Sequence, residues 1–252
     1  MGRACRQCLY ATFFMNYSSF LVVHVTPVMV YRRTDKVVRR LAQRHAAIIA
    51  AARATAAEAG MAAVQIAPVA ERAGIAAGTV YRYFPSKTDL VAALVAAVSE
   101  AEIDAMRRAA DTAPGPLSGL AVGIATFASR ALARRRLAWA VIAEPVDAEA
   151  DQVRLGYRRA LAAEIEMRLQ AAIKAGVLPP EDSTRAAAAL VGAMLEGLIG
   201  PLAPTISADP AATRDTVQQL TLFALRAVGV TDPRARGLVV QLPVSDGPLA
   251  AS

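Results

Sequence analysis

Two short helix-forming stretches lie close together in the first third of the chain, over residues 66–73 and 77–84. The three residues between them include Gly74, which ends helices readily, and Ile75, whose apolar side chain suits a buried turn. Pro85 disfavours helix at the residue before it and therefore ends the second stretch. Two short helices joined by a glycine-containing turn predict a helix-turn-helix, whose second helix enters the major groove of DNA.

Longer helices are predicted on both sides of this motif. The preceding one begins near Val37, and Gly60 stops it. Its apolar face repeats at spacings of three and four residues and comprises Leu41, His45, Ile48, Ile49, Ala52, Ala56 and Ala59. The following helix spans residues 87–110, with Ser86 as its cap and Asp89 in its first turn.

The positive charge of the chain is concentrated in the same region. Residues 32–87 carry ten Lys and Arg against three acidic residues, a net charge of +7 that equals the net charge of all 252 residues. The remainder of the chain is close to neutral. This localisation indicates a module that binds a polyanion, attached to a body without a strong charge.

Several residues near the start of the second short helix have side chains suited to DNA. Small residues at 76–78 allow a close approach to the groove, and Thr79 can contact a base edge or a thymine methyl group. Arg82 can reach guanine or phosphate. The hydroxyl groups of Tyr81 and Tyr83 suit phosphate oxygens, and Lys87 adds a cation at the rim.

The sequence AERAGIAAGTVYRYFPSKTDL at residues 70–90 closely resembles the DNA-binding signature of TetR-family transcriptional regulators. The resemblance extends firmly over about residues 39–95. It implies an all-α fold in which an N-terminal three-helix helix-turn-helix domain is followed by a larger helical domain for ligand binding and dimerisation. It also implies about nine helices, a homodimer, a palindromic double-stranded operator and a small-molecule effector.

The residues and the resemblance together predict the DNA-contacting positions. They are Arg39, Arg40, Gln65, Ala77, Gly78, Thr79, Tyr81, Arg82, Tyr83 and Lys87. Gln65 stands where the family often has Thr, and Gln is a poorer helix cap. Arg39 and Arg40 have two interpretations: a basic arm in the minor groove or a solvated helix start. Val80 and Phe84 are expected in the core.

The rest of the chain is predicted to be helical, with breaks at glycine and proline. The expected helices span about 117–133, 135–143, 149–175, 183–200 and 212–228. Gly229 and Pro233 are expected to end the last of them, which leaves residues 234–252 as a loose tail. The predicted organisation is an N-terminal disordered extension (1–31), a DNA-binding domain (32–95, its last helix continuing to about 110), an effector and dimerisation domain (111–230) and a tail (231–252).

The helical body carries no recognisable catalytic or metal-binding pattern. It contains no His, which removes the usual general base, and it lacks the common nucleophile, phosphate and zinc motifs. The acidic residues between 144 and 151 are interpreted as a solvated turn, with a cation site as the less favoured alternative. The arginines at 134–136 are interpreted as a solvated face or a helix-end contact. We therefore predict no catalytic site, no metal and no cofactor, and keep a helical enzyme with a basic domain as an alternative.

The family resemblance implies that an effector binds between the central helices. It also implies that the last helices pack against those of a second copy. Candidate ligand contacts, each equally compatible with core packing, are Phe127, Trp139, Ile142, Tyr157, Met167, Met194 and Glu196. Apolar stripes suited to the dimer interface contain Leu190, Ala193, Met194, Gly197, Leu198, Leu220, Phe223, Ala224 and Val228. Gly192 and other small residues allow helices to approach closely.

Residues 7–31 lack charged side chains apart from His24, yet polar residues and Pro27 interrupt them, so a membrane span is not predicted. Cys5 and Cys8 have CxxC spacing without a second pair, which falls short of a zinc site. A redox- or membrane-linked regulator using this segment is the second alternative. The sequence as a whole predicts a cytoplasmic, ligand-responsive repressor that binds DNA as a homodimer, with no membrane partner.

Overall fold

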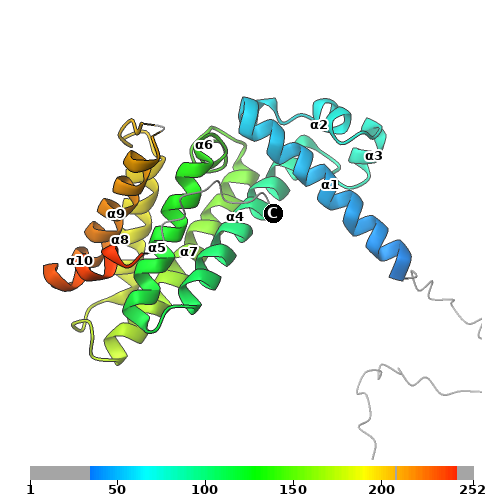
Figure 1. The fold of residues 1–252 in the computed structure, drawn as a ribbon. Coiled ribbons are helices and arrows are strands. Elements are labelled where there is room, and N and C mark those ends of the chain that lie inside the picture. Colours follow the sequence, from blue (N-terminus) through cyan, green and yellow to red (C-terminus); the bar gives the residue numbers. More distant parts are fainter. Residues whose placement is uncertain (1–34, 208, 243–252) are drawn as a thin grey trace, which may run out of the picture.

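The structure, a computed structural model, describes residues 35–207 and 209–242, and the regular elements within them are all helices (Figure 1). They are α1 (Asp35–Ala59), the 3-10 helix η1 (Met61–Ala63), α2 (Ile66–Arg72), α3 (Ala77–Tyr81), α4 (Lys87–Asp111), α5 (Pro116–Ala133), α6 (Arg135–Ile142), α7 (Ala148–Lys174), α8 (Ser183–Leu198), α9 (Pro210–Ala227) and α10 (Asp232–Val240). The predicted all-α fold is confirmed. The predictions for residues 1–34, including those for Cys5 and Cys8, lie outside the described residues.

The first three helices pack around a small apolar core. Ile48 and Ala52 of α1 and Val69 of α2 are fully buried in it. Gly60 ends α1 with a φ of +86°, a backbone conformation that favours glycine. This positive φ turns the chain into η1 and on to α2.

The third helix is shorter than its sequence predicts. It ends at Tyr81, whereas the pattern suggested continuation to Phe84. Pro85 keeps the residue before it out of helical geometry, so the last residues form turns instead. Phe84 remains buried with Val80, as expected, and anchors the helix to the core.

Helix α4 connects the N-terminal helices to the body of the molecule. Ser86 and Asp89 form the predicted start of α4 as a full capping box: the Ser86 side chain accepts from Asp89 N at 3.0 Å, and Asp89 Oδ2 accepts from Ser86 N at 2.9 Å. The helix then runs for 25 residues. Its first half belongs to the small core, and Met106 in its second half belongs to the core of the body.

Helix α5 lies at the centre of the body, against α4, α7 and α9. It is long and apolar enough, by composition, to cross a membrane. In the structure, however, Leu120, Ile124 and Phe127 on α5 are buried among the neighbouring helices. Its apolar character is therefore accounted for by its place in the protein core.

The small core does not stop at α4. Leu137, Ala140 and Val141 of α6, and Ala150 of α7, are buried in the same cluster as the residues of α1–α4. Helix α6 also contacts α1 directly. The body thus contributes α6 and the start of α7 to the core of the N-terminal helices.

The predicted loose tail is wrong for its first part, because α10 spans Asp232–Val240. Pro233 was taken as a terminator, but it lies in the first turn of α10, where its missing N–H costs no helical hydrogen bond. Gly229, with a φ of +84°, does end α9 as expected. Ala235 and Val239 are buried against the body, so the described residues contain ten α-helices rather than about nine.

Candidate nucleic-acid interface and cavity

Helix α3 presents one face to the core and the other to solvent. Val80 is fully buried, whereas Gly78 and Arg82 are exposed and Thr79 is half-buried. The Tyr81 side chain is 53% exposed although its ring is largely apolar. A Cβ placed on Gly78 would meet nothing within 4 Å, so this face is open to an approaching ligand.

Two further predicted contacts lie at the edge of this face. Tyr83 is half-buried against the small core, and Lys87 is exposed in the first turn of α4. His45 of α1 is exposed, and its ring centroid lies 5.0 Å from that of Phe84 and 6.4 Å from that of Tyr83. The histidine therefore packs against the aromatic residues that follow α3.

The remaining predicted contacts lie at the starts of α1, α2 and α3. Arg39 and Arg40 are exposed in the second turn of α1. Gln65 precedes α2 without capping it, because its Nε2 donates to the Ala62 carbonyl at 3.0 Å instead. Ala77, the first residue of α3, is half-buried against the core.

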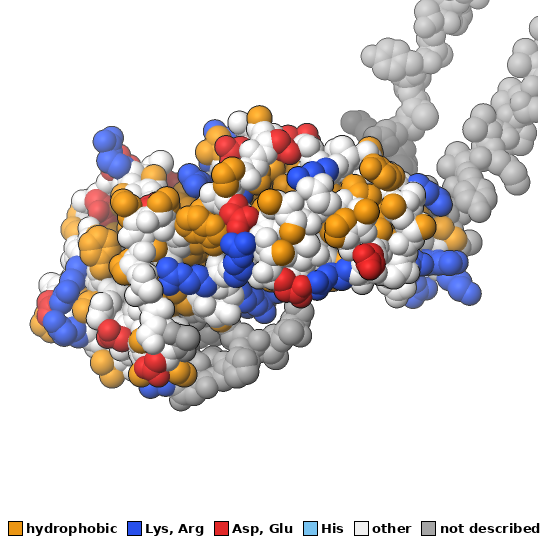
Figure 2. All heavy atoms as spheres, turned by 90° about the horizontal axis from the view of Figure 1, so that it is seen from above, with side chains coloured by type: hydrophobic (Ala, Val, Ile, Leu, Met, Phe, Trp, Pro, Cys, Tyr) orange, Lys and Arg blue, Asp and Glu red, His pale blue; other side chains and the backbone are white. Residues whose placement is uncertain are grey.

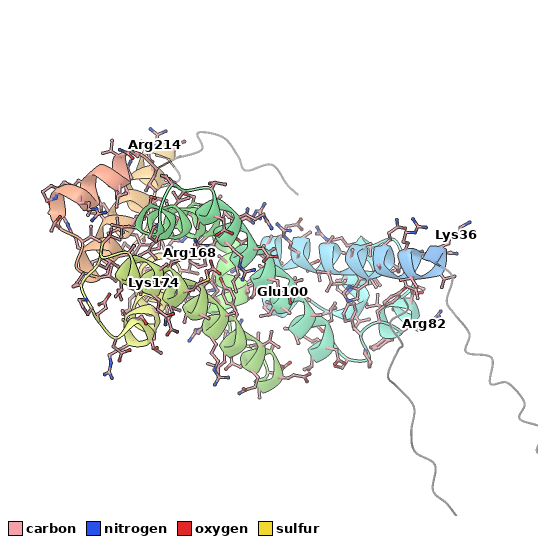
Figure 3. The ribbon with its side chains drawn as sticks, turned by 90° about the horizontal axis from the view of Figure 1, so that it is seen from below. Lys36, Arg82, Glu100, Arg168, Lys174 and Arg214 are labelled. Carbon is pink, nitrogen blue, oxygen red and sulfur yellow. The ribbon has the colours of Figure 1, made fainter. Side chains whose placement is uncertain are left out.

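The cations at this end of the chain are not all equivalent. Arg72 forms an ion pair with Glu58, which raises the pKa of the guanidinium and lowers that of the carboxyl through their hydrogen bonds. Arg82 and Lys36 lie at one end of the molecule, far from Arg214 at the other (Figure 3). Arg82 is thus part of the charged surface beside α3, whereas the charge of Arg72 is compensated.

A small, partly open cavity of about 30 Å³ lies between α4, α5, α6 and α7. Three of the seven proposed ligand contacts line it: Phe127, Ile142 and Tyr157. A space of this size matches one water molecule, whereas ligand pockets have volumes of roughly 300–1,000 Å³. The described conformation is therefore nearly closed.

The other four proposed ligand contacts lie elsewhere. Trp139 faces a separate open depression beside α6, and Met194 is fully buried in the core. Met167 is 50% exposed on the outer face of α7. Glu196 accepts a hydrogen bond from Leu202 N at 2.8 Å and borders an open cleft. Helical spacing alone did not distinguish these positions from the cavity wall.

The cavity has a polar side that the sequence did not reveal. Glu102 accepts hydrogen bonds from Arg130 Nε at 2.5 Å and Nη2 at 3.0 Å. Ser99 is buried, and its Oγ has no hydrogen-bond partner in the described part of the chain. Burial raises the pKa of the Tyr157 phenol, and the charge of Glu102 raises it further, so that this group stays neutral.

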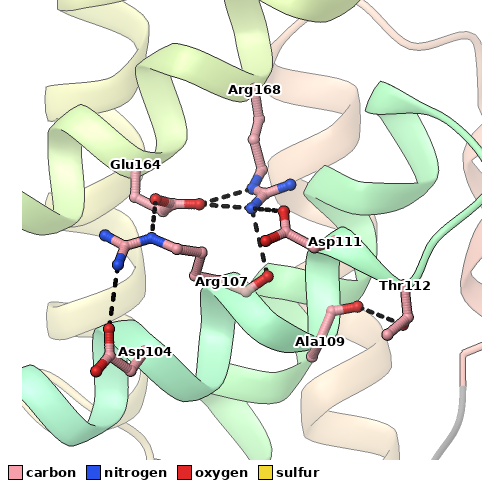
Figure 4. A network of polar contacts seen from close by, with 7 residues as sticks. All are labelled: Asp104, Arg107, Ala109, Asp111, Thr112, Glu164 and Arg168. Carbon is pink, nitrogen blue, oxygen red and sulfur yellow. Dashed lines mark hydrogen bonds and ion pairs between the residues drawn. The ribbon is translucent and has the colours of Figure 1, made fainter. Parts of the chain in front are cut away.

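An ionic network centred on the buried Glu164 and Arg168 ties the last turns of α4 to α7 (Figure 4). Glu164 accepts from Arg107 Nε at 3.1 Å and from Arg168 Nε at 3.0 Å. Arg168 also donates to Asp111 Oδ1 at 2.9 Å, and Arg107 donates to Asp104. The hydrogen bond to Glu164 is the main cause of the raised pKa of Arg107. This network fixes one end of α4.

A second set of contacts joins the region after α6 to η1 and the start of α4. Glu144 accepts from Met61 N at 2.5 Å and from Arg136 Nη1 at 2.7 Å. Thr88 Oγ1 of α4 donates to Asp147 Oδ2 at 2.9 Å. These bonds connect the acidic turn, predicted to be solvated, with η1 and the start of α4.

Helices α8 and α9 leave a mixed apolar face at the surface. Ala193, Gly197, Leu220 and Phe223 are exposed or half-buried on it, with Phe223 55% exposed. The other proposed interface residues are buried within the chain itself: Leu190, Met194, Leu198, Ala224 and Val228. These five pack in the body of their own chain because α8 and α9 must first cover α5 and α7.

Comparison with known proteins identifies the N-terminal region first. The sequence model for "Bacterial regulatory proteins, tetR family" matches residues 48–94. Over 54 residues the chain is 48% identical to the HTH-type transcriptional repressor KstR of Rhodococcus jostii (strain RHA1). That match covers 21% of this chain and 26% of the repressor, about a quarter of its length.

Among the described residues, no group of His, Cys, Asp or Glu is suited to hold a metal ion.

Solved structures resemble a much longer part of the chain. The structure of RolR in complex with resorcinol has a TM-score of 0.61 at 26% identity and covers 82% of this chain and 100% of its own. TylP, a TetR regulator from Streptomyces fradiae, has a TM-score of 0.58 at 23% identity. The match covers 82% of this chain and 93% of TylP. FadR from Bacillus subtilis, solved with stearoyl-CoA, has a TM-score of 0.56 at 21% identity. The match covers 78% of this chain and 98% of FadR. The last two show likeness of fold.

Proposed function

Since the chain belongs to the TetR family of bacterial transcriptional regulators through its N-terminal domain, we propose that it is a homodimeric, cytoplasmic repressor that a small effector releases from a palindromic operator. The exposed face of α3, fixed to the core by Val80 and Phe84, is the observation that carries this proposal. Repression is favoured by the likeness of this domain to KstR, a repressor.

In this proposal α3 is the recognition helix and the residues around it hold the phosphate backbone. Thr79 and Arg82 read base edges, and Gly78 allows the helix to enter the groove closely. The side chains of Gln65, Tyr81, Tyr83 and Lys87 contact phosphate, and Ala77 lies beside the DNA at the start of α3. Arg39 and Arg40 reach the minor groove from the second turn of α1. All of them are exposed or half-buried, so DNA can reach them without unfolding the domain.

The proposed dimer forms through the α8 and α9 face that contains Phe223. A large aromatic side chain that is 55% exposed is costly to leave in water, and pairing with the same face of a second copy buries it. Two-fold symmetry then sets two recognition helices on half-sites about one helical turn apart.

The proposed effector site is the cavity between α4, α5, α6 and α7. RolR was solved with resorcinol and FadR with stearoyl-CoA, so proteins of this fold hold small molecules. Leu137 and Val141 of α6 line the cavity and also belong to the core of the DNA-binding end. A ligand that enlarges the nearly closed cavity must shift α6, and the conformer that it selects differs in the placement of α3.

Selection of bound sequences from a random duplex pool tests the proposal. We expect enrichment of a palindrome, with an affinity that falls steeply as salt increases because lysine and arginine displace counterions from phosphate. The Tyr81→Ala, Arg82→Ala variant is the matched control and should enrich nothing. Failure of the natural protein to enrich a palindrome at moderate salt would contradict the proposal.

A further inference from the structure

A second, open space lies on the other side of Arg134 and Leu137. It is a groove of about 600 Å³ between α1 and the turn from α5 to α6. Its floor is made of small apolar residues, chiefly alanines of α1. Four arginines line it, and no acidic residue does: Arg53, Arg134, Arg135 and Arg136. Figure 2, a view of the molecule from above, shows Lys and Arg side chains interspersed with Asp and Glu over the middle of that face.

The positive charge in this groove is only partly compensated. Arg136 pairs with Glu144, and Arg135 donates to the Pro204 carbonyl at 3.1 Å, which carries no formal charge. Arg134 lies 3.8 Å from Glu102, which is already engaged by Arg130. Burial lowers the pKa of Arg134, and repulsion from Arg53 and Arg130 lowers it further. An anion in the groove would relieve this repulsion.

The backbone also contributes to the positive electrostatic potential in the groove. Helix α6 begins at Arg135, and its first helical hydrogen bond runs from Ala138 N to Arg134 O. The N–H groups of residues 135–137 therefore have no partner within the helix, and they carry the positive end of its dipole. Guanidinium groups and helix N–H groups together suit carboxylate or phosphate oxygens.

The groove and the small cavity share two lining residues, Arg134 and Leu137. Beyond Leu137 the cavity is lined mainly by apolar side chains, and the buried Ser99 hydroxyl there has no partner in the described residues. A ligand with a charged head in the groove can therefore place an apolar body in the cavity once Leu137 moves aside.

We propose that the effector is an amphipathic anion, whose carboxylate or phosphate head binds Arg53 and Arg134 in the groove and whose apolar body occupies the cavity. This inference rests on the proposed function for its regulatory meaning. The head would bridge α1 of the DNA-binding end and α6 of the body, so binding would act directly on their relative position.

DNA is the alternative polyanion for these arginines. Arg53 lies 13 residues after Arg40 on α1, about 20 Å along the helix axis. The proposed contacts at the start of α1 and around α3 thus lie well away from the groove. Phosphate binding at Arg53 would place the DNA backbone on the junction of α1 and α6 instead, and the test below separates the two.

The test compares octanoate, octyl phosphate and 1-octanol as ligands of the full chain, measured by titration calorimetry without DNA. We expect at least one anion to bind ten times more tightly than the alcohol, and the better anion identifies the head group. Arg53→Gln and Arg134→Gln should each weaken anion binding about tenfold, and Arg53→Gln, which changes only the groove, should leave binding of the alcohol unchanged. Arg159→Gln, which removes an exposed cation on α7 outside both spaces, should change neither.

Equal affinities for the anions and the alcohol would overturn the inference, as would unchanged anion binding in both groove variants. A lower salt dependence of DNA binding in Arg53→Gln, with anion binding unchanged, would assign the groove to DNA. Because the titrations contain no DNA, a protein that fails to select an operator contradicts the proposed function and leaves the result on anion binding intact.

Discussion

Lys87 is exposed in the first turn of α4, and in the proposed complex it neutralises one phosphate. Replacing it with Gln should weaken binding to every DNA sequence alike and lower the slope of log K against log salt by about one. Lys174→Gln, at the opposite end of the molecule (Figure 3), is the control and should leave the slope unchanged. A change in sequence preference instead would assign Lys87 to base reading.

Glu164 is buried between two arginines, and its removal would leave the buried Arg168 with only the exposed Asp111 as a carboxylate partner. We expect Glu164→Gln to lower the free energy of unfolding by about 3 kcal/mol, measured by urea denaturation. Glu58→Gln removes a carboxylate from an exposed ion pair and should leave the urea midpoint nearly unchanged. Equal losses in the two variants would show that burial does not determine the strength of the network.

Residue by residue, sequence reasoning worked where a side chain had one plausible environment. Val80, on the core-facing side of α3, and Phe84, in the turn after α3, are buried as expected because both apolar side chains face the small core. Arg134 was interpreted as solvated or at a helix end, and it does flank α6, yet it also lines the cavity. The packing of α4, α5 and α6 determines which charged side chains border the cavity. The spacing of residues within one helix does not reveal this packing.

At the scale of elements, Gly60 separates α1 from η1 with a φ of +86°, and a Cβ there would meet Arg136 and Glu144. Gly60→Ala should destabilise the protein by about 1–2 kcal/mol because alanine resists a positive φ. Gly156→Ala, in the exposed middle of α7 with nothing near its added Cβ, should stabilise the protein by up to about 1 kcal/mol. Thermal unfolding of both variants checks the opposite signs.

Helices α7 and α8 begin with aspartate caps whose pKa values are lowered, mainly by hydrogen bonds from the backbone N–H groups of Ala150 and Arg185. A carboxyl with a lower pKa in the folded state contributes stability at neutral pH, and this contribution disappears as the pH falls below about 4. Between pH 5 and pH 3, the free energy of unfolding measured in urea should fall less for Asp147→Asn than for the natural protein. Glu149→Gln, which removes a neighbouring carboxylate outside the cap, should retain the full acid loss.

Elements bounded by an unambiguous stop signal were predicted well, and α10 shows where this fails. Ser86 and Gly60 have one reading each, a cap and a terminator, and both stand where the sequence placed them. Pro233 has two readings, since proline both follows helices and begins them. Docking of Ala235 and Val239 on the body decides between these readings, and the sequence does not show that contact.

At the scale of the whole molecule, the dimer proposal depends on the exposed part of α8 and α9. Phe223→Arg should convert the proposed dimer to a monomer, so that the mass from light scattering falls from about twice to once 26.4 kDa. Val38→Arg is the control, since Val38 is 51% exposed but lies on α1, at the other end of the fold. A dimer that persists in Phe223→Arg would move the interface to another face.

The 25 residues of α4 make it about 37 Å long, with its last turns tied to α7 through Glu164 and its first turn close to α3. It therefore has the geometry of a lever. A tilt of about 5° around the tied end displaces the other end by about 3 Å, close to the 3.4 Å rise of one base pair. In the proposed two-fold dimer this end of α4 moves in both copies, so the same small tilt would change the spacing of the two α3 helices by about two base-pair steps.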